Sequence, residues 1–274
     1  MSRLSTKSSD TNWVLSRERK KNLFLKKRNI NYIMLRALLS VLLPLAALAT
    51  YGVDVSTRVT QDKWSCLKSS YGANFAIIRV YQSNGKVDPN GAATINDARN
   101  AGIPYVDGYI FPCYSCGNPE QQMDDTINYL SASGVRLLRD KETHDIVMGM
   151  NSTQTLHSGE KIDVTSTAGM LWIDVEGTQY WSSNAQSNVD FIQGMVDEGV
   201  RQGIVLGIYT SNSQWSPIAG GSSQFASYPL WYPHYDSNPS FSDFSSFGGW
   251  NSPSVKQYQG TSYQCDVGLD MNYY

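Results

Sequence analysis

Two acidic side chains, Asp174 and Glu176, lie two residues apart around the end of a short apolar run, residues 170–175. In a β-strand, side chains at positions i and i+2 leave the same face, roughly 6.6 Å apart along the chain. Two carboxyls on one buried face have their pKa values pushed apart, because burial and like charge both oppose ionisation. A proton donor beside a charged carboxylate suits acid catalysis near neutral pH. The same pattern also fits a strand whose acids are salt-bridged or face solvent at a sheet edge.

The chain around these acids alternates short apolar segments with helix-like stretches. The predicted strands are residues 51–55, 75–80, 105–110, 170–175, 204–209, 229–232, 255–259 and 267–271. The predicted helices are residues 62–70, 90–101, 119–133 and 184–202. This alternation favours an α/β fold with a parallel sheet, and eight strands indicate a closed, TIM-like β/α barrel with fewer than eight helices. Barrel enzymes carry their chemistry at the C-terminal ends of the strands, where Asp174, Glu176 and Asp54 fall.

The composition fits a single barrel domain with an acidic surface. The 274 residues are enough for one α/β barrel with a large core. Tyr and Trp are plentiful, 17 and 7, as in proteins that stack against sugar rings, although such rings also fill cores. Residues 1–36 carry 10 of the 22 Lys and Arg but 2 of the 24 Asp and Glu, so the remainder has a net charge of −10. An acidic body disfavours nucleic acid and anionic membranes as partners.

Residues 34–49 have the layout of a secretory signal peptide. A charged start and an apolar centre lead to Ala47-Leu48-Ala49, a small-x-small pattern, so we expect cleavage near Ala49 and an extracellular mature protein. The apolar run is too short and too interrupted by Pro44 for a comfortable membrane span, although an uncleaved membrane anchor is the alternative. Residues 1–33 are basic and unpatterned, and we expect disorder there or a misplaced start codon. Residues 50–274 are then the barrel domain.

One stretch, residues 140–168, does not fit the alternation. It is polar and lacks strong periodicity, and loops of this length are uncommon inside compact domains. It also contains the sequon Asn151-Ser152-Thr153, which marks Asn151 as a candidate glycosylation site. We interpret the stretch as an insertion or a retained intron.

The four cysteines, Cys66, Cys113, Cys116 and Cys265, suit an oxidising compartment. Three pairings are possible. We favour Cys113–Cys116 with Cys66–Cys265, because the second bond would tie the first and last elements of the barrel together. A C-x-x-C motif can also bind zinc or carry out redox chemistry, but no second such motif or suitable His spacing accompanies it.

Taken in order, several segments resemble the Chalaropsis-type lysozymes, glycoside hydrolase family 25, and most of all the secreted animal members found in nematodes. The resembling stretches are 52–56 (GVDVS), 75–79 (FAIIR), 172–176 (WIDVE), 207–210 (GIYT), 230–231 (LW) and 268–272 (GLDMN). Each motif alone is weak, whereas the ordered set is specific and spans the barrel domain apart from residues 140–168. The resemblance implies an irregular β/α barrel that cleaves the β-1,4 bond between N-acetylmuramic acid and N-acetylglucosamine in bacterial peptidoglycan.

This resemblance also implies roles for four acids. Glu176 is the general acid that protonates the departing glycosidic oxygen, so it has to be protonated before the reaction. Asp174 stays charged, and it either supports the developing oxocarbenium ion or orients the 2-acetamido group of the substrate as an internal nucleophile, the route that the family favours. Asp54 and Asp270 resemble two further acidic positions that line the cleft. Alternatively Asp54 caps a loop and Asp270 bonds the first helix, and Asp266 competes with Asp270.

Four further side chains are candidate substrate-binding groups: Arg79, Tyr109, Tyr209 and Trp231. Arg79 either pairs with an acid at the barrel mouth or forms a structural salt bridge. The three rings stand at strand ends, where they either contact sugar or fill the core. Catalysis by carboxylates requires no cofactor, and the sequence has no metal-ligand spacing or phosphate loop. The expected partner is bacterial peptidoglycan, bound by a monomer without an obligatory protein partner.

Two other functions fit a barrel with these acids. One is a catalytically silent barrel that binds glycan or acts in signalling, which a missing acid would favour, although both acids are present. The other is a chitinase-like hydrolase, but those enzymes usually extend the acidic pattern upstream, where this chain has Met170-Leu171-Trp172. The acidic body favours an acidic pH optimum, and the family favours bacterial cell-wall breakdown in defence or digestion.

Overall fold

A computed structural model describes residues 50–138, 153–155, 161–163 and 167–274 of the chain. All of them belong to one compact unit, Ala49–Tyr274. The predicted leader, signal peptide and glycosylation site at Asn151 lie outside the described residues and stay predictions. Within the described ranges, no helix is both long and apolar enough to cross a bilayer.

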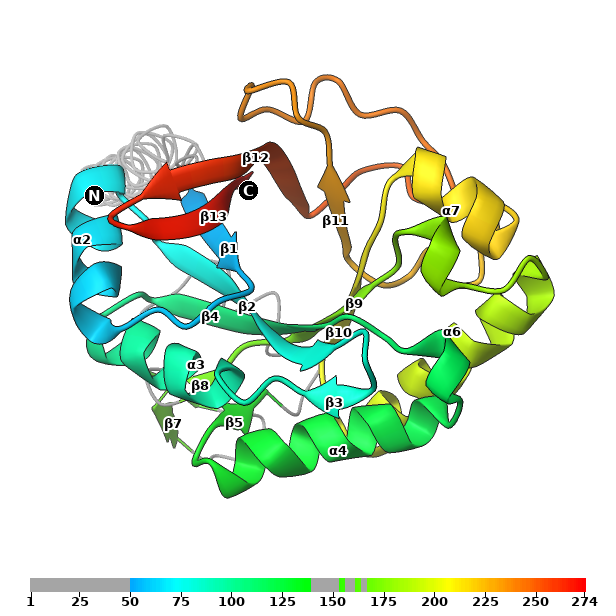
Figure 1. Cartoon of the computed structure of the whole chain (residues 1–274). Helices are drawn as coiled ribbons and strands as arrows, with labels where there is room; N and C mark the ends of the chain where they lie inside the picture. Colours follow the sequence, from blue (N-terminus) through cyan, green and yellow to red (C-terminus); the bar gives the residue numbers. More distant parts are fainter. Residues whose placement is uncertain (1–49, 139–152, 156–160, 164–166) are drawn as a thin grey trace, which may run out of the picture. The chain divides into compact units, whose positions relative to one another are not determined.

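Eight strands close into a barrel, as Figure 1 shows. They are β1 (Tyr51–Val55), β2 (Phe75–Gln82), β4 (Tyr105–Ile110), β9 (Leu171–Asp174), β10 (Leu206–Tyr209), β11 (Leu230–Pro233), β12 (Val255–Gln264) and β13 (Val267–Tyr273). Around the barrel the order is β1-β13-β12-β11-β10-β9-β4-β2, and β2 pairs again with β1. A two-residue strand, β3 (Lys86–Val87), extends the sheet beside β2. The predicted eight-stranded barrel is confirmed.

The last strand departs from the predicted parallel sheet. β13 is antiparallel to both of its neighbours, β12 and β1, whereas all the pairs from β12 round to β1 through β2 are parallel. The reason is local: β12 and β13 are joined by a two-residue turn at Cys265 and Asp266, both with positive φ. Such a turn reverses the chain at once and leaves no room for a crossover helix.

Five helices of the described part surround the barrel. They are α2 (Gln61–Tyr71), α3 (Gly91–Asn100), α4 (Pro119–Ala132), α6 (Ala185–Arg201) and α7 (Asn212–Ala219), and two short 3-10 turns cover Tyr114–Cys116 and Thr178–Tyr180. The first four match the predicted helices to within one residue at each end. α7 was not predicted, and its interior Pro217 is a residue that normally argues against a helix.

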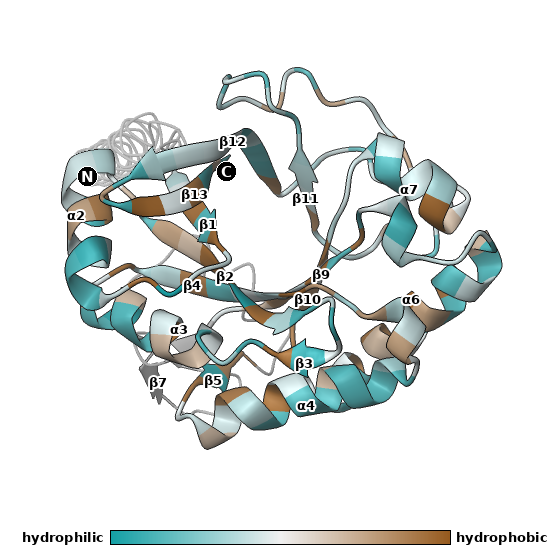
Figure 2. Cartoon of the chain, viewed as in Figure 1, coloured by the Kyte–Doolittle hydropathy of each residue, from teal (hydrophilic) through white to brown (hydrophobic). Residues whose placement is uncertain are grey.

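The strand side chains divide between two apolar layers. Along β9 and the residues that flank it, Met170 and Trp172 belong to a cluster that fills the inside of the barrel, and Leu171, Ile173 and Val175 belong to the layer between strands and helices. In Figure 2 apolar residues follow central strands such as β9, while polar residues cover much of α4. The alternation places Asp174 on the inward face of its strand.

The stretch 140–168 joins the barrel at the start of β9, opposite the end that carries Asp174. Its described parts are β8 (Thr167–Ala168), which pairs with β5 (Arg136–Leu137) just before the stretch, and the antiparallel pair of β6 (Thr153–Thr155) and β7 (Lys161–Asp163). The origin of this stretch as an insertion or retained intron stays a prediction.

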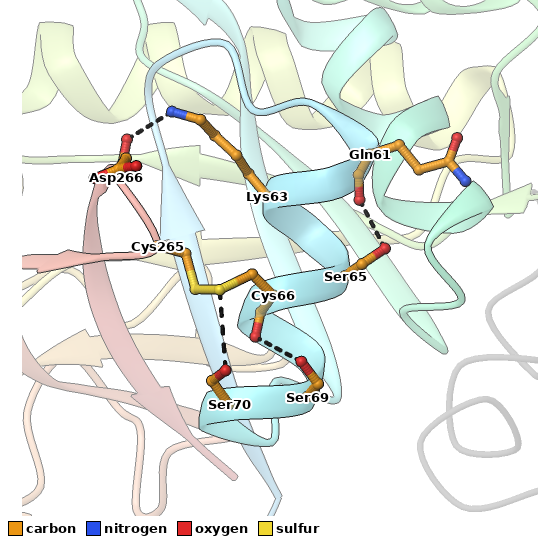
Figure 3. Close-up of a disulfide and its surroundings, with 8 residues drawn as sticks. All are labelled: Gln61, Lys63, Ser65, Cys66, Ser69, Ser70, Cys265 and Asp266. Atoms are coloured by element: carbon orange, nitrogen blue, oxygen red, sulfur yellow. Dashed lines mark hydrogen bonds between the residues drawn. A yellow bond between two sulfur atoms is a disulfide. The ribbon is translucent and has the colours of Figure 1, made fainter.

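Both favoured disulfides are present. Cys66 in the middle of α2 is bonded to Cys265 in the β12–β13 turn, as Figure 3 shows, and the neighbouring Lys63 ammonium donates to the carbonyl of Asp266 at 2.8 Å. The second bond joins Cys113 to Cys116 in the loop between β4 and α4. The first bond holds the β12–β13 hairpin against the first helix of the barrel.

Candidate active site

Four carboxyl groups gather at the C-terminal end of the parallel strands. Asp54 lies near the end of β1 and is the direct register partner of Asp270 on β13. Asp174 ends β9, and Glu176 follows two residues later. Their charges act on one another: Asp270 and Glu176 raise the pKa of Asp54, and Glu176 and Asp54 raise that of Asp174. The fold therefore brings together all four acids that the sequence singled out.

Burial is the largest reason that the pKa of each of these carboxyls is raised. Burial, followed by the charge of Asp270, raises the pKa of Asp54 to about 8. Burial, followed by the charge of Glu176, raises the pKa of Asp174 well above its ordinary value. The pKa values of Glu176 and Asp270 are raised as well, again first by burial. Carboxyls that share a buried site cannot all ionise together, so the cluster holds protons near neutral pH.

Asp174 and Glu176 differ in their surroundings. Asp174 is 4% exposed, and within the described residues its buried Oδ1 accepts no hydrogen bond. Glu176 is only half-buried, so it can meet a ligand more readily. A buried carboxylate without a donor is strongly disfavoured. A charged Asp174, as expected from the sequence, therefore depends on a hydrogen-bond donor that a substrate would bring.

One amide side chain, Gln257 on β12, connects the acids of β1 and β13. Its Nε2 donates to Asp54 Oδ2 at 2.8 Å and to Asp270 Oδ2 at 3.1 Å. Its Oε1 accepts from the hydroxyls of Tyr209 at 2.7 Å and Tyr235 at 2.8 Å. Both amide hydrogens and both oxygen lone pairs are thus used, which fixes the orientation of the amide.

A second amide supports the same carboxyl. Asn272 Nδ2 donates to Asp54 Oδ2 at 2.7 Å, and Asn272 Oδ1 accepts from the indole of Trp231 at 2.8 Å. Both amides lower the pKa of Asp54, although burial outweighs them. Asp270 is held by the backbone amide of Thr261, which donates to its Oδ1 at 2.6 Å. Asp266, the competing acid, lies instead in the hairpin turn beside Cys265.

Arg79 forms an ion pair that lies outside the four-carboxyl cluster. Its Nε donates to Asp88 Oδ2 at 2.8 Å, and its Nη2 donates to the carbonyl of Ser56 at 2.8 Å. Asp88 is buried, so the observed pair is a structural salt bridge, and a role of Arg79 in substrate binding stays a prediction. The guanidinium charge nevertheless lowers the pKa of Asp174 somewhat, after the larger opposing effects.

The three predicted rings form one buried aromatic group under the carboxyls. Trp231 packs edge-on against Tyr209 at 4.4 Å and against Tyr109 at 6.1 Å between ring centroids. Burial raises the pKa of Tyr109 well above its ordinary value, and the charges of Asp54 and Asp174 add to that effect. Tyr109 therefore lies close to both acids, and Trp231 and Tyr209 hold the two amides described above.

Two residues of this network, Gln257 and Tyr235, were not singled out from the sequence. The available signal for Gln257 was a polar pair, Lys256-Gln257, inside a predicted strand, and both side chains are buried. Tyr235 lies in the loop after β11, and nothing in its sequence surroundings marks it. A third residue, Asn272, was part of a matching motif but received no role.

Within the described residues, a group of side chains that could hold a metal ion lies outside the four-carboxyl cluster. His234, Asp236 and Asp243 come together in the loop between β11 and β12. The ammonium group of Lys256 lies 2.8 Å from a carboxylate oxygen of each aspartate. The chain thus supplies its own cation to these carboxylates, and the pKa of Asp243 is held well below its ordinary value by Lys256, His234 and Tyr232 despite partial burial.

Comparison with known proteins shows which family the chain is similar to. The family model described as Lysozyme-like protein 1 matches residues 46–139 and 149–258. A Dictyostelium discoideum protein named Probable GH family 25 lysozyme 2 is 45% identical over 82% of this chain and 91% of its own length. Lysozyme-like protein 5 of Caenorhabditis elegans is 32% identical over 82% of this chain and 91% of its own length.

A solved structure has the same fold. A family GH25 lysozyme from Aspergillus fumigatus superposes with a TM-score of 0.58 over 82% of this chain and 93% of its own length. Its sequence identity is 19%, so this likeness concerns the barrel alone.

Proposed function

Because this chain belongs to glycoside hydrolase family 25, the lysozyme family, we propose that it hydrolyses the β-1,4 bond between N-acetylmuramic acid and N-acetylglucosamine in bacterial peptidoglycan. The observation that carries the proposal is the cluster of Asp54, Asp174, Glu176 and Asp270, in which burial raises every pKa and the charges of neighbouring acids add to the effect on Asp54, Asp174 and Glu176. Such a cluster keeps a carboxylic acid protonated at a pH where an isolated carboxyl is ionised.

Glu176 is the proton donor in this proposal. It is the less buried acid of the β9 pair and has a raised pKa, so it meets a bound glycan with its proton in place. The proton passes to the glycosidic oxygen as the bond between that oxygen and the sugar C1 breaks. The departing sugar leaves with a free hydroxyl, and Glu176 becomes a carboxylate.

Asp174 assists the 2-acetamido group of the substrate. The acetamido oxygen attacks C1 from the face opposite the departing sugar and forms a positively charged ring. The N–H of the same acetamido group donates to the carboxyl of Asp174. This donor satisfies the buried Oδ1 of Asp174, and the developing positive charge favours the ionised form of that carboxyl. Glu176 then takes a proton from a water that opens the ring, which restores both groups and retains the configuration at C1.

Asp54 and Asp270 act on Asp174 and Glu176 through their charges. Their charges raise the pKa values of Asp174 and Glu176 respectively, and Gln257 holds both acids in place. The proposal also includes secretion after cleavage near Ala49, action as a monomer, and a biological setting in bacterial cell-wall breakdown for defence or digestion.

Product analysis tests the proposal. Purified protein is incubated with bacterial peptidoglycan and, separately, with chitin, and the new reducing ends are identified by mass spectrometry. Release of fragments that end in N-acetylmuramic acid, with chitin left intact, is the expected result. Cleavage of chitin would point to a chitinase-like hydrolase, and no product from either substrate would point to a silent glycan-binding barrel.

A further inference from the structure

A hollow lined by residues that follow shortly after Glu176 in the chain has a lining that suits a sugar. Its volume is about 230 Å³, and it is formed by the loops that follow β2, β4 and β9, at the same end of the barrel as the carboxyls. We call it the Tyr180 hollow, and its principal lining residues are Ser83, Tyr114, Ser115, Gln179, Tyr180 and Trp181.

One wall of the Tyr180 hollow is hydrogen-bonded to the backbone of Glu176. The indole of Trp181 donates to the carbonyl of Glu176 at 3.0 Å. Tyr180 packs edge-on against Phe111 at 5.2 Å, and Phe111 in turn packs against the aromatic cluster inside the barrel. The hollow is therefore fixed to the backbone of Glu176, at the end of the barrel where a glycan with its cleaved bond at Glu176 would lie.

Hydrogen bonds and a disulfide within the chain fix the loop that forms one wall of the Tyr180 hollow. Gln122 accepts from the Cys113 amide at 2.9 Å and donates to the carbonyls of Cys113 and Gly117, both at 2.8 Å. The Cys113–Cys116 disulfide closes the same loop, and the turn at Gly85 packs so tightly on it that an added Cβ would meet Cys116 Sγ at 2.6 Å. The C-x-x-C motif therefore has a structural role, because it fixes one wall of the hollow.

The chemistry of the lining favours a neutral ligand rich in hydroxyls. The lining contains aromatic rings, serine hydroxyls and the amide of Gln179, and none of its side chains is charged. Aromatic surface combined with a few polar groups is typical of sites for amphipathic ligands such as pyranose rings. A charged peptide would find no counter-ion in it. We propose that the Tyr180 hollow is an additional subsite that binds one uncharged N-acetylhexosamine unit of the glycan strand.

This inference rests on the proposed glycan cleavage, because the same strand would have to occupy both places. It predicts that the enzyme prefers long strands to short ones. Tyr180 is 45% exposed, so its replacement leaves the core intact. Loss of one aromatic contact of this kind weakens binding roughly three- to tenfold.

The kinetic test compares wild type with Tyr180→Ala on peptide-free glycan strands of four and of eight sugars. We expect KM for the eight-sugar strand to rise roughly three- to tenfold, and the ratio of the two KM values to move toward one. The matched control is Tyr263→Ala, since Tyr263 is 70% exposed on the β12–β13 hairpin. An unchanged KM ratio in Tyr180→Ala, with the wild type active, would overturn the subsite and leave the proposed function standing.

A binding test separates this inference from catalysis. Calorimetric titration uses Glu176→Gln and Glu176→Gln/Tyr180→Ala with oligomers of N-acetylglucosamine and, in a second series, with the free stem peptide of peptidoglycan. Weaker binding of the oligomer to the double variant supports the subsite even if the wild type cleaves nothing. Equal binding of the oligomer to both variants, or binding of the peptide that depends on Tyr180, would refute it.

Discussion

Gln257 Nε2 lies 2.8 Å from Asp54 Oδ2, in a part of the barrel where both side chains are buried. The same nitrogen reaches Asp270, so one neutral amide connects two carboxyls that are register partners on neighbouring strands. Neutral donors stabilise an ionised carboxyl without adding a charge of their own, and Gln257 accordingly lowers the pKa of Asp54 against the larger effect of burial.

Replacement of Gln257 by Leu should impair both activity and stability. It removes the donor to Asp54 and Asp270 and leaves the hydroxyls of Tyr209 and Tyr235 without their acceptor. We expect the free energy of unfolding to fall by about 1–3 kcal/mol, the usual effect of orphaned buried polar groups. We also expect kcat on peptidoglycan to fall by about tenfold or more, because the carboxyls lose their fixed geometry.

The control for this change is Gln259→Leu, on the same strand with an exposed side chain. Urea unfolding and initial rates are measured for both variants. Equal effects of the two substitutions would contradict the positioning role of Gln257.

Stability should decrease as the pH rises from about 4 to 8. The pKa of Asp54 is about 8 in the folded protein against an ordinary value of 3.8, so between these values the folded state binds more protons than the unfolded state. The free energy of unfolding then falls with rising pH, by at most about 1.4 kcal/mol per pH unit for one such group. Asp174, Glu176 and Asp270 contribute with the same sign, since their pKa values are also raised.

Thermal unfolding at pH 5 and pH 8 measures this effect. We expect a higher Tm at pH 5, and a smaller difference in Asp54→Asn, whose amide oxygen can still accept from Gln257 and Asn272. A wild type that is more stable at pH 8 would show that the cluster does not hold protons in the folded state.

The rate of peptidoglycan cleavage should decline on the alkaline side of its pH profile. Glu176 acts as an acid only while protonated, and burial together with the charge of Asp270 raises its pKa. Removing that charge by Asp270→Asn should move the alkaline limb to lower pH. The profile of kcat/KM is the measurement. A maximum above pH 8 would contradict the assignment of Glu176 as the acid.

The Cys66–Cys265 disulfide should stabilise the protein more than the Cys113–Cys116 disulfide. The cysteines of the first bond are 199 residues apart in sequence and those of the second are 3 apart, and a longer closed loop restrains the unfolded chain more. We expect Cys66→Ser/Cys265→Ser to lose about 2–4 kcal/mol of unfolding free energy. Chemical denaturation of the two double serine variants compares them. An equal loss in both would mean that loop closure is not the main contribution.

Much of the barrel was predictable because its strands and four of its helices carry strong local patterns. The inward face of β9 follows from the alternation of Met170, Trp172 and Asp174 alone. The direction of β13 was not predictable in this way, since it depends on the tight turn at Cys265 and Asp266. Helix α7 was not predicted, because Pro217 lies inside it and proline normally argues against a helix.

Some residues of the site could likewise be predicted from the sequence, and others could not. Asp54 and Asp174 lie near the C-terminal ends of parallel strands and Glu176 follows shortly after β9, so the meeting of these three acids at one end of the barrel followed from the predicted topology. The position of Asp270 depends in addition on the antiparallel direction of β13. Gln257 and Tyr235 are long-range partners of that cluster, and no spacing within the sequence connects them to it. The pairing of Arg79 with Asp88 likewise depends on a loop conformation that only the folded chain defines.

The central claim is that Glu176 donates the proton that breaks the glycosidic bond. The most direct measurement is the rate of peptidoglycan cleavage by Glu176→Gln, with Glu120→Gln as the control because Glu120 is an exposed carboxylate on α4. We predict a loss of at least about a hundredfold in kcat for Glu176→Gln, an unchanged circular dichroism spectrum and Tm no lower than that of wild type, and no loss for Glu120→Gln. Wild-type cleavage rates in a folded Glu176→Gln protein would contradict the claim.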